Sequence, residues 1–208
     1  MINRQENYSW AELKAIFGER TQAWISFRVP FADSHSEWVS LIEEAVDYIG
    51  QAMVNTREIY QQSREDALTI HITEHLKDLN FDAGHETKRG GHCDIVVYGK
   101  QSYLWVAEAK IHRDYDWLLA GVDQLLTRYA SGLVGQDSGE LLIYHFGRRT
   151  DTVVDHWEQR LREAHPEAGV SRCKGDDQVL RSTHKHEGTG RPYRVRHKAL
   201  SLYFDPKK

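Results

Sequence analysis

The fold is decided by residues 93–110, which read CDIVVYGKQSYLWVAEAK. Two apolar runs, 93–98 and 103–109, flank the turn-forming segment GKQS, and this pattern predicts a β-hairpin. Asp94 opens the first strand, whereas Glu108 and Lys110 end the second, two positions apart and therefore on one face of it. If the two strands are antiparallel neighbours, we expect Asp94 to lie beside Glu108.

Ionisable side chains within apolar strands indicate a functional site. A buried carboxylate is unfavourable unless it binds a partner. Two carboxylates at one sheet edge, Asp94 and Glu108, could hold a hard cation such as Mg²⁺, with Mn²⁺ as a substitute, because such ions prefer oxygen ligands and retain several waters. The ion would polarise a phosphodiester and activate a water, and Lys110 would position that water or stabilise negative charge in the transition state. The competing interpretation is a structural ion pair at the rim of the sheet.

The tripeptide [DE]-x-K carries little information by itself, because it occurs four times in the chain. The occurrences that begin at Glu12, Glu86 and Asp205 fall in a predicted helix, before a Gly-Gly turn and near the C-terminal end. Only Glu108-Ala109-Lys110 ends an apolar strand that follows another strand opened by Asp. The signal is this context and not the tripeptide.

The segments around the hairpin predict an α/β architecture. Residues 9–17 read as a short helix capped by Ser9 and Glu12, and residues 34–79 have a helical pattern with a break near Gly50 or Asn55. Further strands are expected at 81–87, 141–146 and 199–204, a turn at 88–91, and helices at 116–130 and at 151–164, the last capped by Asp151. We therefore expect a mixed central sheet flanked by helices, with a core at 57–208 and an N-terminal helical extension at 1–56 for dimerisation or partner contact.

The series Glu65…Asp94…Glu108-x-Lys110…Gln124 resembles the PD-(D/E)xK nuclease superfamily, over roughly residues 60–146. The resemblance implies a restriction-endonuclease-like fold and Mg²⁺-dependent hydrolysis of DNA, in which water attacks in line and leaves a 5′-phosphate. It also implies that Glu65 and Gln124 belong to the site. Glu65 is preferred to Glu74 because it is in line with the apolar stripe of its helix.

Two features depart from the superfamily pattern. Cys93 stands where many members have proline before Asp94, and the spacing from Gln124 to Tyr129 is one residue longer than the common one. The second departure puts a site role of Tyr129 in doubt. By analogy at the level of fold, a chain of this size with no evident sequence-reading module suggests an endonuclease effector of a prokaryotic defence or mobile-element system.

The overall charge does not favour nucleic-acid binding, because the 208 residues carry a net charge of −4. A local excess of cations is found between residues 181 and 198. We expect this basic tail to bind backbone phosphates through Arg191, Arg194, Arg196 and Lys198. The alternative is a solvated tail that pairs with acidic helices. The Lys88-Arg89 turn and Arg128 are the next candidates for a DNA contact.

Composition bounds the remaining possibilities. No apolar run is long enough to span a bilayer and the first residues are polar, so we expect no membrane contact and a cytoplasmic location. Zinc ligation by Cys173, His184 and His186 would lack a second spaced pair, and Trp105 and Trp117 are assigned to the core. Two functional alternatives remain open: a non-catalytic nucleic-acid-binding or assembly protein on the same fold, and a nuclease directed at RNA.

Overall fold

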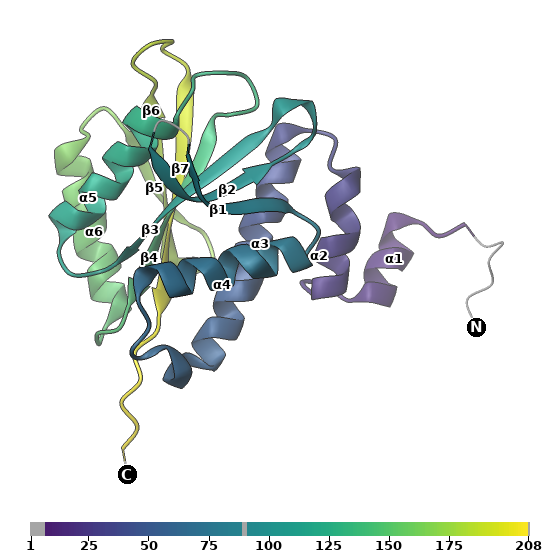
Figure 1. The fold of residues 1–208 in the computed structure, drawn as a ribbon, viewed down its shortest axis with the longest axis horizontal. Coiled ribbons are helices and arrows are strands. Elements are labelled where there is room, and N and C mark those ends of the chain that lie inside the picture. The colour runs from purple at the N-terminus through teal and green to yellow at the C-terminus, as the bar shows by residue number, and fades with distance from the viewer. Residues whose placement is uncertain (1–6, 89–90, 208) are drawn as a thin grey trace.

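The computed structural model describes residues 7–88 and 91–207 and has an α/β architecture (Figure 1). A seven-stranded mixed sheet has the order β1-β2-β3-β4-β7-β6-β5. This confirms the expected mixed sheet flanked by helices. The strands are β1 (Asp82–Lys88), β2 (His92–Tyr98), β3 (Leu104–Ile111), β4 (Ser138–His145), β5 (Gly169–Cys173), β6 (Asp176–Lys185) and β7 (Pro192–Ser201). The helices are α1 (Trp10–Phe17), α2 (Gln22–Arg28), α3 (His35–Asn55), α4 (Glu65–Asp78), α5 (Tyr115–Gln124) and α6 (Thr150–Ala164).

The centre of the sheet is parallel and its two flanks are antiparallel. β3, β4 and β7 run parallel to one another, whereas β1, β2 and β3 form one meander and β5, β6 and β7 another. α5 connects β3 to β4, as a parallel pair requires. Because β4 has helices on both faces, all of its residues are buried.

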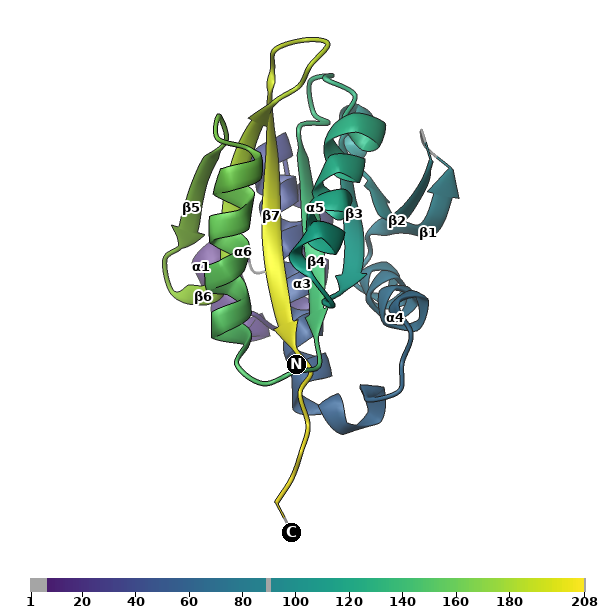
Figure 2. The ribbon, with the colours of Figure 1, turned by 90° about the vertical axis from the view of Figure 1, so that its left-hand side faces the viewer.

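Helices cover both faces of the sheet (Figure 2). α3 and α4 pack on one face, in a core that includes Trp105 and Ala107 of β3, and α5 and α6 pack on the other, in a core that includes Val106. This alternation along β3 places Glu108 and Lys110 on the α5 side, because side chains two apart share a face. Among the described residues, no helix has the length and apolarity needed to cross a membrane.

The N-terminal helices do not form a separate core. α3 is one continuous helix through Gly50 to Asn55, so the expected break lies only at its end, where a 3₁₀ turn follows. A side chain at Gly50 would collide with Leu200 of β7, which shows how closely α3 packs on the sheet. The boundary expected at residue 56 therefore divides a shared hydrophobic core, whereas α1 buries no residue and lies at the outer edge (Figure 1).

The N-terminal caps predicted for α1 and α6 have different outcomes. Ser9 and Glu12 form the expected capping box of α1, with the Glu12 amide donating to the Ser9 hydroxyl and the Ser9 amide to the Glu12 carboxylate. The assignment of Asp151 as the cap of α6 was wrong. The cap is Arg149 in a left-handed conformation, and the Asp151 carboxylate accepts hydrogen bonds from the Arg149 side chain.

The C-terminal segment differs most from the expectation. Residues 169–201 form three strands of the sheet where a basic tail with a last strand at 199–204 was expected. The pattern was missed because several inward-facing positions are polar, among them Ser182, His184 and Arg196. Of the predicted turn at 88–91, Arg89 and Gly90 lie outside the described residues.

Candidate active site

The site lies where β2 and β3 separate. Their pairing runs from Tyr98 opposite Leu104 to Ile95 opposite Ala107 and then ends. Beyond that point two carboxylates take over amide groups of β3. The amide of Ala109 donates to Asp94 Oδ2 at 2.8 Å, and the amide of Ile111 donates to Glu65 Oε2 at 2.6 Å. The parting strands therefore create a gap into which Asp94 and Glu65 both project.

Glu108 and Lys110 form a buried ion pair beside this gap. Lys110 Nζ donates to Glu108 Oε1 at 2.6 Å, and the two side chains are only 6% and 2% exposed. α5 covers them closely because Gly121 has no side chain. A Cβ there would lie 3.4 Å from Lys110 Cγ and Cε and 2.8 Å from Leu141 Cδ1. The Lys110 ammonium also lies 4.6 Å from the ring centroid of Trp117.

The environment disfavours the charged form of all three carboxyl groups. Burial, followed by the negative charge of Asp94, raises the pKa of Glu108 to about 7. Burial also raises the pKa of Asp94, against the effect of the Ala109 amide and of Lys110, and it raises the pKa of Glu65. With three carboxylates facing one ammonium, the site has an excess of negative charge when all are ionised.

This excess fits a divalent cation. Glu108 Oε2 is buried and has no hydrogen-bond partner among the described residues, although buried polar atoms normally have one. Asp94 and Glu108 supply the hard oxygen donors that Mg²⁺ prefers, with waters completing its shell. No set of three or more His, Cys, Asp or Glu side chains within residues 7–88 and 91–207 is placed to hold a metal. A metal here would have to rely on two carboxylates and water.

Four of the five residues expected at the site come together: Glu65, Asp94, Glu108 and Lys110. Gln124 is half-buried at the end of α5, three residues after Gly121, so it lies on the same side of the helix. Within the described chain, no hydrogen bond joins the Gln124 side chain to the carboxylates. Glu74, the rejected alternative to Glu65, is exposed and pairs with Lys77.

Residues that the sequence did not assign to the site also contact it. His85 of β1 makes a 2.8 Å hydrogen bond through Nδ1 to the carbonyl of Asp94. Tyr129, in a π-helical turn after α5, donates to the carbonyl of His92 at 2.6 Å and so anchors the start of β2. Trp105 is core, as expected, but Trp117 is only partly buried and lies against Lys110. A tryptophan in an amphipathic helix gives no sequence signal that separates these two environments.

The basic residues expected to contact DNA are largely engaged within the protein. Arg196 is 3% exposed and bridges Glu140 of β4 and Asp47 of α3, and Lys198 pairs with Asp176 at 2.6 Å. Arg194 pairs with Asp137, and Arg191 donates to the carbonyl of Gly132. The alternative interpretation, pairing with an acidic helix, describes Arg196 and also Arg181, which binds Glu43 of α3.

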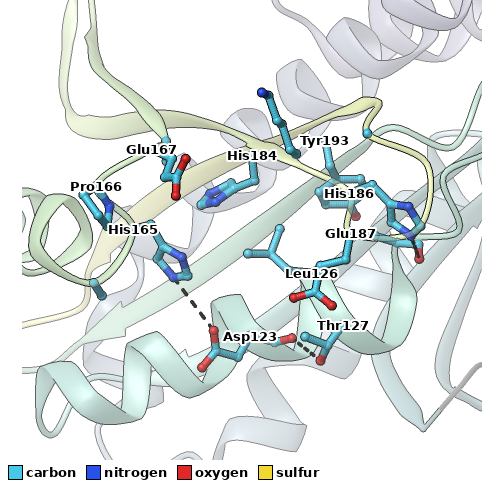
Figure 3. Close-up of a pocket in the computed structure, with 15 residues that line it drawn as sticks. Asp123, Leu126, Thr127, His165, Pro166, Glu167, His184, His186, Glu187 and Tyr193 are labelled. Atoms are coloured by element: carbon cyan, nitrogen blue, oxygen red, sulfur yellow. Dashed lines mark hydrogen bonds and ion pairs between the residues drawn. The ribbon is translucent and has the colours of Figure 1, made fainter.

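A separate hollow, of about 540 Å³, is lined by the end of α5 and the turn after it, by the segment that follows α6, and by the β6–β7 hairpin. Figure 3 shows the side chains of Asp123, Glu167 and Glu187 around it, with His165 directed toward Asp123 at 3.8 Å. Glu65, Asp94, Glu108 and Lys110 do not line it. Its three carboxylates outnumber its one ammonium, Lys185, so the net charge of the lining disfavours a phosphate.

Comparisons of the chain with protein-family models, with curated proteins and with solved structures find no match.

Proposed function

We propose that this chain is a Mg²⁺-dependent nuclease on a restriction-endonuclease-like fold and that it hydrolyses phosphodiester bonds of DNA. One observation carries the proposal. Asp94, Glu108 and Lys110 converge where β2 and β3 part, and Glu108 Oε2 is buried with no hydrogen-bond partner in the described part of the chain. Such an arrangement destabilises the free protein and is explained by a ligand that carries positive charge.

Each side chain has a distinct task in this proposal. Asp94 and Glu108 would hold the ion, which when bound polarises a phosphodiester and makes a nearby water more acidic. Lys110 favours the ionised form of Glu108, against the effect of burial, and places an ammonium where negative charge develops on the phosphate. Glu65 accepts from the Ile111 amide and thereby fixes the end of β3. α5 and Trp117 shield the Lys110 ammonium from water and so strengthen its interactions.

The test is cleavage of plasmid DNA, linear DNA and RNA, each with Mg²⁺, Mn²⁺ or EDTA. We expect cleavage of DNA with either ion and none in EDTA. Asp94→Ala and Glu108→Ala should abolish it, and Lys110→Ala should be inactive yet still bind metal. Glu74→Ala is a matched control, because Glu74 is an exposed acid paired only with Lys77 among the described residues.

The outcomes separate the alternatives. Full activity in folded Asp94→Ala or Glu108→Ala would remove this site from the proposal. Cleavage of RNA alone would replace DNA as the substrate. Binding of DNA without any cleavage, in either ion, would favour the non-catalytic binding protein.

A further inference from the structure

Four cations of residues 181–198 are held in ion pairs, namely Arg181, Arg194, Arg196 and Lys198. Strands β6 and β7 are also separated from β3 by β4, so a DNA backbone at the site calls for cations closer to the carboxylates. The question rests on the proposed function and concerns which side chains hold the substrate. The described cations nearest in sequence to the site are Arg64, directly before Glu65, Arg113, which follows β3, and Arg128, directly before Tyr129. All three are exposed.

Arg113 has the most defined geometry of the three. Its guanidinium carbon lies 3.9 Å from the centroid of the Trp117 ring, the ring that Lys110 Nζ approaches to 4.6 Å. One indole therefore contacts two cations, a buried ammonium beside the carboxylates and the guanidinium of Arg113, whose side chain is 63% exposed. A cation within about 6 Å of an indole centroid is attracted by the ring, so the guanidinium is held without a buried acidic partner.

The chemistry of that arrangement suits a phosphate. A guanidinium stacked on a ring keeps its N–H donors at its edge, where they match the spacing of phosphate oxygens. The acid paired with Arg113 is its neighbour Asp114, at 3.3 Å, and both side chains are more than half exposed. Such an exposed pair is worth little, so a phosphate can compete for the guanidinium.

We propose that Arg113, held against Trp117 beside Lys110, binds a backbone phosphate of DNA next to the phosphate that is cut. In this proposal Lys110 contacts the phosphate that is cut, and Arg113 contacts the next phosphate along the same DNA strand. Arg64 and Arg128 extend the contact on either side, and no ion pair among the described residues includes either of them. Arg128 Cδ lies 3.4 Å from the position that a Cβ on Gly91 would take, so it borders the start of β2, the strand that carries Asp94.

The experiment measures DNA affinity in Ca²⁺, an ion that often supports binding without cleavage, across a salt series. Each phosphate contact adds about 0.9 to the slope of log affinity against log salt, so Arg113→Ala should lower the slope by about 1. Its affinity at moderate salt should fall about tenfold, as expected for loss of a charge-assisted hydrogen bond. In Mg²⁺, the loss should appear mainly in KM and much less in kcat. Arg172→Ala, an exposed arginine on edge strand β5, is the matched control and should change neither quantity.

Variants of Trp117 test separately whether its ring positions Arg113 and Lys110. Trp117→Leu should weaken binding and also lower kcat, since both Arg113 and Lys110 lose their ring, and Trp117→Phe should recover part of both. An unchanged salt slope and KM in Arg113→Ala, in a protein that still cleaves DNA, would overturn this inference and leave the proposed function intact. A wild-type protein that neither binds nor cleaves DNA would overturn the proposed function and this inference together.

Discussion

Replacing Glu108 by Gln should make the metal-free protein more stable at pH 8. Burial and the charge of Asp94 raise the pKa of Glu108 from 4.5 to about 7 in the folded state. A raised pKa means that folding favours the protonated form. The contribution of protonated Glu108 to the free energy of unfolding is fully present below the unfolded pKa, near 4.5. It is lost as the pH rises through the folded pKa, near 7. The shift corresponds to about 3 kcal/mol.

Gln isolates this effect because it does not titrate and retains an acceptor for Lys110 Nζ. Lys110 still faces the carboxylates of Asp94 and Glu65, which both interact with it. The difference in the free energy of unfolding between Glu108→Gln and wild type should be near zero at pH 4.5. It should approach about 3 kcal/mol in favour of the variant above pH 7.

The measurement is urea denaturation between pH 4.5 and pH 8.5, with and without Mg²⁺. Mg²⁺ should stabilise wild type at pH 8 more than at pH 5, because its ligands must be deprotonated, and it should stabilise Glu108→Gln much less. Glu74→Gln serves as a control with no change in this window. If Glu108→Gln is the less stable protein at pH 8, the ion pair with Lys110 outweighs the repulsion among the carboxylates, and the argument for a cation fails.

Three further changes test other parts of the structure. Glu65→Gln keeps an acceptor for the Ile111 amide and should lower kcat less than Asp94→Ala does, while Glu74→Gln should be silent; the reverse result would mean that the wrong face of α4 was chosen. Gly121→Ala should cost about 1–3 kcal/mol in urea unfolding and also lower kcat, because the new methyl group meets Leu141 and displaces Lys110; normal stability and kcat would show that α5 has room to move. Arg196→Ala leaves Glu140 buried without its partner and should cost about 3–5 kcal/mol while leaving the salt slope of DNA binding unchanged; a reduced slope in a stable variant would restore Arg196 as a DNA contact.

The catalytic core of the proposal was readable from the sequence because charge inside an apolar strand is rare. Asp94, Glu108 and Lys110 stand out against their neighbours, and the period of two along a strand places the last two on one face. The separation of β2 and β3 was not readable. It depends on Asp94 accepting from the Ala109 amide in place of a backbone carbonyl, and hydrophobic pattern does not report where a ladder ends. Arg113 and Trp117 were missed because their contact crosses from the end of β3 to the first turn of α5.

The basic segment shows why net charge along a sequence is a weak guide to surface charge. Arg196 and Lys198 alternate with Val195, His197 and Ala199, so they occupy one face of β7 and point toward α3. That face is acidic, since α3 contributes Glu43 and Asp47 and β4 contributes Glu140, which has no exposed surface. Each cation is thus matched by an acid more than forty residues away or on another strand, and neither local pattern nor composition contains that pairing.

A buried arginine between two carboxylates cannot bind a phosphate as well without leaving Glu140 unpaired. We therefore expect a DNA backbone to be contacted by exposed cations near the carboxylates, such as Arg64, Arg113 and Arg128, which no local excess of charge marks in the sequence.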